Sequence, residues 1–169
     1  MFSRTSGTHA LHEVDGKYHL PSSLTRSEIV HIALSLQFKN LQARPVMSNP
    51  TEVKQYFQTR LSDHSREIFS VMFLSTKHHL IDCVDMFVGT LDSAQVSIRD
   101  VVKASLQHNA SAVIIAHNHP SGVDTPSEAD KRLTHHMSEA LTLFSINLLD
   151  HIIVGDGSVT SLAELGCVK

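Results

Sequence analysis

The sequence predicts an α/β (α+β) protein in which a mixed β-sheet is flanked by helices. Segments rich in β-branched and aromatic residues alternate with segments that carry helix start signals. Their order is β-β-α-β-α-β-β, which favours a mixed sheet packed against helices. At 169 residues, the chain has room for one ordinary domain and a small appendage.

Composition and charge indicate a folded protein without a nucleic-acid or membrane partner. Hydrophobic residues make up 41% of the chain and charged residues 18%, which is typical of globular proteins. A net charge of -3, with no run of Lys or Arg, gives no general attraction to phosphate backbones. Cys83 and Cys167 form no CxxC pair, so no thiolate zinc site or disulfide framework is indicated. No signal-peptide core or membrane-length apolar stretch is present, and we expect a cytoplasmic protein of undefined oligomeric state.

Two helices are predicted in the first part of the chain. A capping box at residues 25–28 and apolar residues spaced along one face predict a helix over residues 26–40. The sequence Ala-Arg-Pro at residues 43–45 breaks this pattern. A second start signal at residues 49–52, with Asn as the cap and Pro at the first helical position, predicts a short helix that ends near Leu61.

The middle of the chain changes to strand character. The segments EIFSVMFLST and HLIDCVDMFV, within residues 67–89, predict two antiparallel strands joined by a turn at Lys77-His78. Apolar residues between positions 98 and 106 then suit a buried helix. The apolar run AVIIAHNH at residues 112–119 predicts a central strand.

The last part of the chain predicts a long helix and a hairpin. The segment TPSEADKRLTHHMSEALTLF follows a Pro/Gly loop, and we expect Thr125 to cap its helix with Pro126 at the first helical position. The segment LLDHIIVGDGSVTSL predicts two strands with a turn at Asp156-Gly157.

Candidate metal ligands gather where the predicted central strand ends. His117 and His119 are two residues apart on an extended segment, so their imidazoles point to the same face and can reach one ion. Ser127 and Asp130 are three apart on one face of the following helix, and Asp130 can supply a third ligand. Three nitrogen and carboxylate ligands leave a fourth position for water, which is typical of a catalytic zinc site. Such a site also needs a base to manage the proton of the water.

Plainer interpretations compete with a functional one for several residues. The chain contains 13 histidines, so some close pairs arise by chance, and we interpret His78-His79 and His135-His136 in this way. A Ser in the first turn of a helix, such as Ser127, often only satisfies backbone amides.

Three further polar residues are candidates for supporting roles. Asn118 lies between the two histidine ligands and should point the other way, where a structural hydrogen bond is expected. Asp150-His151 can orient a zinc-bound histidine, since such histidines donate their other ring nitrogen to an acceptor. A structural role at a sheet edge is the favoured interpretation of this pair.

The motifs resemble those of a known family. Glu67, followed at a distance by HxHP and then SxxD, resembles the JAMM, or MPN-type, metallopeptidase signature. The segment HNHPSGVDTPSEAD is similar to the RadC-type branch of that family. The similarity covers most of residues 48–169, including LDHIIVGDG, and implies a deaminase-like αβα sandwich. We therefore divide the chain into an N-terminal segment with one helix, residues 1–47, and a JAMM/MPN metallohydrolase domain, residues 48–169.

The resemblance implies a zinc-dependent, metallopeptidase-like hydrolase with one Zn²⁺ per chain, acting on a peptide or isopeptide bond of a peptide or protein substrate. It implies that His117, His119 and Asp130 bind zinc, that Glu67 is the general acid/base and that Ser127 assists the oxyanion. Two alternatives stay open: a non-catalytic MPN-type interaction module, and a zinc hydrolase of a non-peptide substrate. The intact ligands together with Glu67 argue against the module, because an interaction domain needs none of them.

The N-terminal region departs from the family pattern. Full-length RadC-type proteins resemble this chain in the catalytic domain but carry a helix-hairpin-helix region ahead of it. Here one helix with a start signal fits before residue 48, and no Gly-rich hairpin motif is recognised. The resemblance therefore gives little support to a role in DNA metabolism.

Overall fold

A computed structural model describes residues 49–62, 64–89 and 96–168, together with residues 12–14, 17–19, 24–25, 29–30 and 32–33. The helices are α2 (Pro50–Leu61), α3 (Ile98–Gln107) and α4 (Glu128–Thr142). The strands of the main sheet are β3 (Glu67–Leu74), β4 (Leu80–Gly89), β5 (Ala112–Asn118), β6 (Asn147–Val154) and β7 (Val159–Ser161). A separate antiparallel pair consists of β1 (His12–Val14) and β2 (Lys17–His19).

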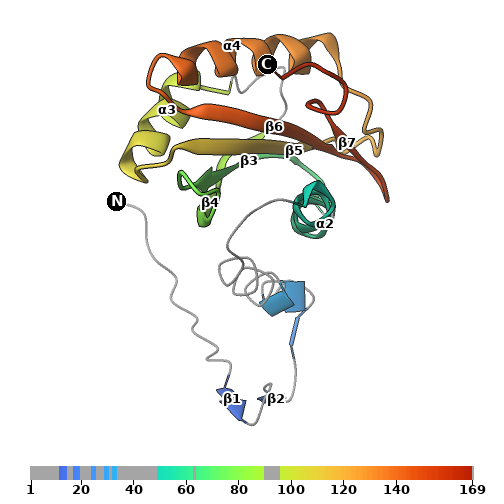
Figure 1. The fold of residues 1–169 in the computed structure, drawn as a ribbon. Helices are drawn as coiled ribbons and strands as arrows, with labels where there is room; N and C mark the ends of the chain where they lie inside the picture. Colours follow the sequence, from blue (N-terminus) through green and yellow to red (C-terminus); the bar gives the residue numbers. More distant parts are fainter. Residues whose placement is uncertain are drawn as a thin grey trace.

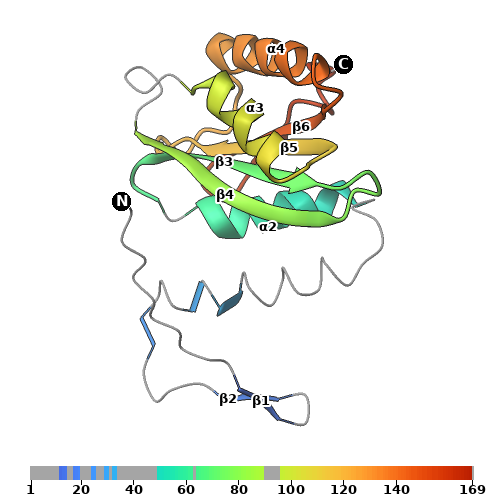
Figure 2. The ribbon, with the colours of Figure 1, turned by 90° about the vertical axis from the view of Figure 1, so that its left-hand side faces the viewer.

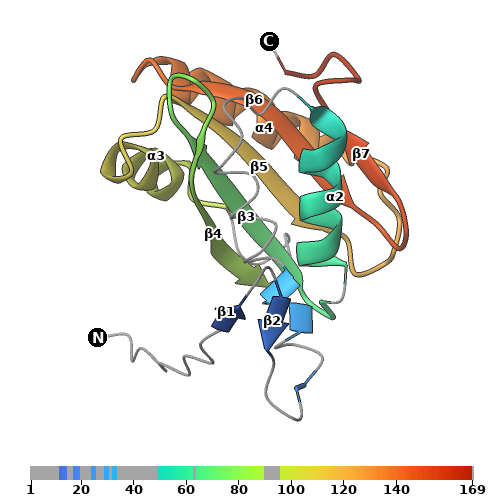
Figure 3. The same cartoon turned by 60° about the horizontal axis from the view of Figure 1, so that its bottom comes forward.

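The main sheet is mixed, as the sequence predicts. Its strand order is β4-β3-β5-β6-β7, in which β5 and β6 are parallel and the other neighbours are antiparallel. The helix α2 covers one face of the sheet, whereas α3 and α4 cover the other (Figure 1, Figure 2). Figure 3 shows α2 lying over the part of the sheet formed by β5, β6 and β7. The αβα layering expected from the family resemblance is therefore confirmed.

Each face of the sheet carries its own apolar core. Successive side chains of a strand point to opposite faces, so alternate residues of β3 and β5 enter different cores. The core under α2 contains Ile68, Met72, Leu74, Ala112, Ile114 and Ala116 from these strands. The core under α3 and α4 contains Phe69, Val71, Phe73, Val113 and Ile115. Because both faces are covered, β5 is buried along its whole length, which explains its uninterrupted apolar run.

The helix starts follow the sequence signals with one correction. The Asn49 side chain accepts from the backbone of α2 as expected, and Ser97 caps α3. The cap of α4 is Ser127 and not the predicted Thr125. Ser127 is the cap because Asp130 lies three residues later. The Ser127 hydroxyl oxygen accepts from the Asp130 backbone N–H, and the Asp130 carboxylate accepts from the Ser127 backbone N–H, which completes a capping box.

Little of the predicted helix over residues 26–40 can be compared with the structure. Residues 29–30 and 32–33 are helical, and the backbone N–H of Ile29 donates to the carbonyl of Thr25 at 3.0 Å. The remainder of that predicted helix lies outside the described residues. Val30 is half-buried and packs against the core under α2. Within the described part of the chain, no helix has the length and apolarity needed to cross a membrane.

A chain that begins at Ser48 is expected to fold without the preceding segment. Both faces of the main sheet are covered by helices that lie after this point, and the truncation removes only the partial burial of Val30 from the described core. The expected loss of stability is less than about 2 kcal/mol. Thermal unfolding of the truncated and full chains measures this difference. A truncated protein that is insoluble or lacks a cooperative transition would place the N-terminal segment in the core.

Candidate metal centre

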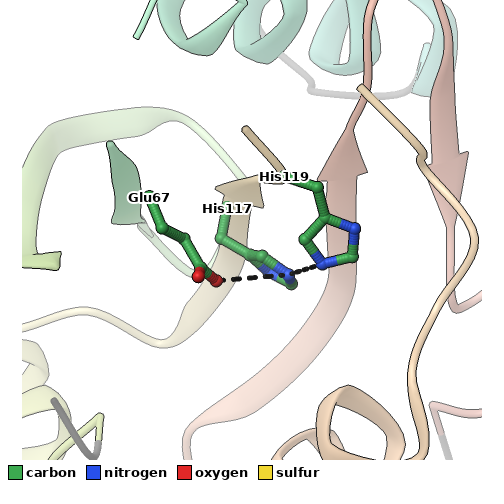
Figure 4. A group of neighbouring side chains, drawn as sticks. All are labelled: Glu67, His117 and His119. Atoms are coloured by element: carbon green, nitrogen blue, oxygen red, sulfur yellow. Dashed lines mark hydrogen bonds and ion pairs between the residues drawn. The ribbon is translucent and has the colours of Figure 1, made fainter. Parts of the chain in front are cut away.

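Three elements bring the predicted site residues to one end of the sheet. His117 lies near the end of β5 and His119 directly follows that strand, while Asp130 lies in the first turn of α4. Strand β3 begins with Glu67, and its register pairs Phe69 with His117. Glu67, two residues before Phe69, therefore points to the same face as His117. Figure 4 shows the side chains of Glu67, His117 and His119 converging.

The polar atoms of four side chains surround one small volume. The Nε2 atoms of His117 and His119 are 2.9 Å apart. The His117 Nε2 lies 3.9 Å from Glu67 Oε1 (Figure 4). The same nitrogen lies 3.3 Å from Asp130 Oδ1. Glu67, His117 and His119 form a group that can hold a metal ion, with ligand atoms within 4.8 Å of one another. Asp130 completes the cluster from the side of α4, where its Oδ2 lies 3.7 Å from His119 Nε2.

Burial and charge set the protonation states in the cluster. Burial lowers the pKa of His117 to about 4, although the neighbouring Asp130 carboxylate opposes this shift. The same carboxylate raises the pKa of the less buried His119. Burial disfavours the ionised form of Asp130, but His119 and the Ser127 hydrogen bonds outweigh it and hold the pKa of the carboxyl well below its usual range. At neutral pH the cluster thus holds a neutral His117 beside a carboxylate.

The donor set fits a metal ion. The Nδ1 of His119 lies 2.6 Å from the Val123 carbonyl oxygen. A carbonyl only accepts, so this nitrogen carries a hydrogen, and the Nε2 is the atom that can offer a lone pair to a metal once it has no hydrogen of its own. The Asp130 Oδ1 is buried and has no hydrogen-bond partner among the described residues. A buried acceptor left without a partner costs about 1–3 kcal/mol, which a bound cation would offset. Imidazole nitrogen and carboxylate oxygen are ligands that zinc accepts.

Ser127 holds Asp130 in place. The Ser127 hydroxyl donates to Asp130 Oδ2 at 2.6 Å, and its backbone N–H donates to the same oxygen at 2.7 Å. These bonds occupy Oδ2 and leave Oδ1 directed at His117. In this structure the Ser127 hydroxyl donates its hydrogen to Asp130. The role of Ser127 at the oxyanion stays a prediction.

Asn118 has the structural role that the sequence predicts. Its side-chain oxygen accepts from the backbone N–H of Ile68 at 2.8 Å, and its amide donates to the carbonyls of Arg66 at 3.1 Å and His64 at 3.3 Å. These bonds fix the backbone on both sides of Glu67. Asn118 thereby couples the end of β5 to the start of β3.

The favoured interpretation of Asp150-His151 is wrong for His151. Strand β6 lies between β5 and β7 and is not a sheet edge. His151 is fully buried, and its Nε2 lies 2.8 Å from the Nδ1 of His117. Its Nδ1 lies 2.6 Å from the hydroxyl of Thr134, a residue that the sequence reasoning missed. The sequence signal for Thr134 is its spacing, one helical turn after Asp130.

Asp150 has a separate, structural role. Its Oδ1 accepts hydrogen bonds from the backbone N–H groups of His151 and Ala163, and its Oδ2 accepts from the Ser161 hydroxyl at 2.6 Å. The carboxylate thus holds the turn after β7 against β6.

Two pockets are each lined by one residue of the cluster. One, of about 630 Å³, includes Asp130 and lies between the starts of α3 and α4. The other, of about 320 Å³, includes His119 and the loop after it. The lining of the first is partly apolar, with Val96, Ile98 and Leu133, and carries the positive side chains of Arg99 and Arg132.

Gly155 shapes the loop that positions His119. A Cβ atom at this residue would lie 2.5 Å from the Gly122 carbonyl oxygen and 2.9 Å from the Asp124 backbone nitrogen. Both neighbours are backbone atoms, so the contact cannot be relieved by a side-chain rotation. Between them lies Val123, whose carbonyl accepts from His119.

We therefore expect Gly155→Ala to displace this loop, to lower stability by about 1–3 kcal/mol and to weaken metal binding through His119. Thermal unfolding and zinc titration measure the two effects. The matched control is Gly157→Asn in the same turn, where an added Cβ meets nothing within 4 Å and Asn tolerates the positive φ of 77°. Equal zinc affinity in the Gly155→Ala protein and wild type would show that this contact does not position His119.

Comparisons with known proteins agree with the resemblance seen in the motifs. Residues 47–167 match the family described as RadC-like JAB domain. A relative from Halorhodospira halophila is 47% identical over 128 residues, which are 76% of this chain and 57% of the relative. A relative from Cellvibrio japonicus is 48% identical over 127 residues, covering 75% and 57% of the two chains. Both relatives carry the name UPF0758 protein. The chain thus spans less than two thirds of the length of these curated relatives.

Proposed function

This chain belongs to the RadC-like JAB domain family, and we propose that it is a zinc-dependent hydrolase of the metallopeptidase type. The proposal is carried by one observation, the convergence of two imidazole nitrogens and the buried Oδ1 of Asp130 on one small volume. The names of the relatives state no reaction. The chemistry is therefore proposed from the site itself.

Asp130 is the proposed third ligand and Glu67 the proposed base. The Asp130 Oδ1 lies closer to His117 Nε2 than the Glu67 Oε1 does, at 3.3 Å against 3.9 Å. Hydrogen bonds from Ser127 fix the Asp130 carboxylate. The side chain of Asp130 is 1% exposed and that of Glu67 is 12% exposed, while the Oε1 atom of Glu67, which faces His117, is itself buried. A fixed carboxylate suits a ligand, and a partly exposed carboxylate suits proton transfer.

The proposed hydrolysis needs a metal ion, a group that transfers protons and a place for the substrate. When bound, zinc supplies a Lewis acid that lowers the pKa of its water to roughly 7 and polarises a carbonyl. The Glu67 carboxylate takes the proton of the attacking water and returns it to the leaving nitrogen. The pockets lined by Asp130 and by His119 are the proposed places for the chain of a peptide or protein substrate. We propose a peptide or isopeptide bond as the bond cleaved.

A substrate screen tests this function. Purified full-length protein is incubated with peptide and isopeptide libraries after zinc loading, after treatment with a chelator, and after zinc is restored. We expect cleavage that the chelator abolishes and zinc restores. Cleavage that persists in the chelator-treated protein would contradict a zinc-dependent mechanism.

A further inference from the structure

We propose that Thr134 and His151 are positioning residues that keep the hydrogen of the His117 ring on Nδ1, so that Nε2 presents its lone pair to the metal position. This inference rests on the proposed function, since it concerns how the chain prepares a ligand for zinc. It follows from the donors and acceptors in a buried series of hydrogen bonds that joins Thr134 of α4, His151 of β6 and His117 of β5.

The Thr134 hydroxyl sets the direction of donation in this series of hydrogen bonds. Its hydroxyl oxygen lies 2.7 Å from the carbonyl oxygen of Asp130, and a carbonyl has no hydrogen to give. Two oxygens at this distance repel unless a hydrogen lies between them, so the Thr134 hydroxyl donates to Asp130. With its hydrogen used, the hydroxyl oxygen accepts from the Nδ1 of His151 at 2.6 Å.

The same reasoning fixes the two rings that follow. His151 is fully buried, and its two ring nitrogens face the Thr134 hydroxyl and the His117 ring. A neutral imidazole carries one hydrogen, so a His151 that donates from Nδ1 has an acceptor at Nε2. That Nε2 lies 2.8 Å from the Nδ1 of His117, which must therefore donate. The Nε2 of His117 is then left as a lone pair, so the hydrogen in its 2.9 Å contact with the Nε2 of His119 belongs to His119 as long as no metal is bound.

The rings are held as well as oriented. His117 and His151 are both fully buried, and Phe69 packs beside them with ring centroids at 6.5 Å and 6.1 Å. The Thr134 hydroxyl also touches the backbone of Asp130, so the hydrogen-bonded chain joins two of the proposed ligands through side chains that do not themselves reach the metal position.

Thr134 and His151 would also be buried if they only stabilised the fold. Conservative variants of Thr134 distinguish this structural role from the positioning of His117. Thr134→Val keeps the shape of the side chain but removes the acceptor, which leaves the His151 Nδ1–H buried without a partner and allows the hydrogen of His117 to move to Nε2. Thr134→Ser keeps the hydroxyl. A structural role predicts losses of thermal stability only, whereas a positioning role predicts that zinc binding follows the hydroxyl.

The experiment measures zinc affinity of the full chain by competition with a chromophoric chelator. We expect Thr134→Val to weaken zinc binding by about 10- to 100-fold, as is typical when an outer hydrogen-bond partner is lost, and Thr134→Ser to bind as wild type does. The matched control is Ser105→Ala. Ser105 is fully buried in α3 and donates to the carbonyl of Val101 one turn earlier, but it lies outside this chain of bonds. Its loss should lower the melting temperature and leave zinc affinity unchanged.

Nitrogen-15 NMR of the imidazoles supplies a second readout that needs neither zinc nor a variant. We expect the hydrogen on Nδ1 of His117 in the metal-free wild-type protein. A hydrogen on Nε2 would overturn the inference, as would unchanged zinc affinity in a folded Thr134→Val protein. If wild type binds no zinc while the NMR spectrum shows the expected tautomer, the proposed function fails and the positioning of His117 stands.

Discussion

The Asp130→Asn protein is expected to fold like wild type but to lose its zinc, with zinc affinity reduced by more than about 100-fold. Loss of a residue that only hydrogen-bonds to a metal ligand lowers metal affinity by up to about 100-fold, and Asp130 is proposed to bind the metal directly. The amide keeps an oxygen for the hydrogen bonds of Ser127 and places a nitrogen without a lone pair where Oδ1 faces His117. Elemental analysis should find about one zinc per wild-type chain, as expected for a single site.

Two further variants separate the ligand role of Asp130 from its role in the helix. Asp130→Ala removes the capping box as well as the ligand, so we expect an additional stability loss of about 1 kcal/mol. Glu128→Gln is the matched control, because Glu128 is an exposed carboxylate in the same helical turn and pairs with Lys131 at 2.7 Å. It should retain zinc. Zinc retained by both Asp130 variants would remove Asp130 from the ligand set and leave the metal to Glu67 and the two histidines.

Most of the fold could be predicted because its signals are local. The hairpin of β3 and β4, the buried strand β5 and the final turn at Asp156-Gly157 follow from β-branched and aromatic residues, apolar runs and turn residues within a few positions. The cap of α4 could not be decided in this way, since Thr125 followed by Pro126 is as good a start signal as Ser127. The choice depends on Asp130, whose carboxylate accepts from the Ser127 backbone N–H and also faces the histidine cluster.

In the candidate site too, residues with local sequence signals could be predicted and residues that depend on long-range contacts could not. His117 and His119 are predictable because spacing along one strand puts them on one face. The place of Glu67 depends on the register between β3 and β5, which only the family resemblance anticipates. His151 is 34 residues from His117 and reaches it because β5 and β6 pair in parallel, a contact with no local signature. Thr134 gains its importance only through that contact.

Glu67→Gln is expected to keep zinc and stability but to lower turnover by a factor of about 100 to 10,000, the usual effect of losing a general base. Glutamine preserves size and hydrogen-bonding capacity, and the bonds from Asn118 that fix the backbone around residue 67 do not involve this side chain. Zinc content, melting temperature and turnover of a substrate identified by screening are measured for wild type and variant side by side.

The three readouts of the Glu67→Gln protein distinguish the possible roles of this carboxylate. Retained zinc with lost turnover supports proton transfer, since the metal then needs no oxygen from residue 67. Full turnover would rule out Glu67 as the base. Loss of both zinc and turnover would make Glu67 a ligand, in keeping with its 3.9 Å distance from His117 Nε2 and its place in the group that can hold a metal ion. With Asp130 also bound, such a site would have four protein ligands and no open position for water, which is typical of a structural zinc site and would favour an interaction domain over an enzyme.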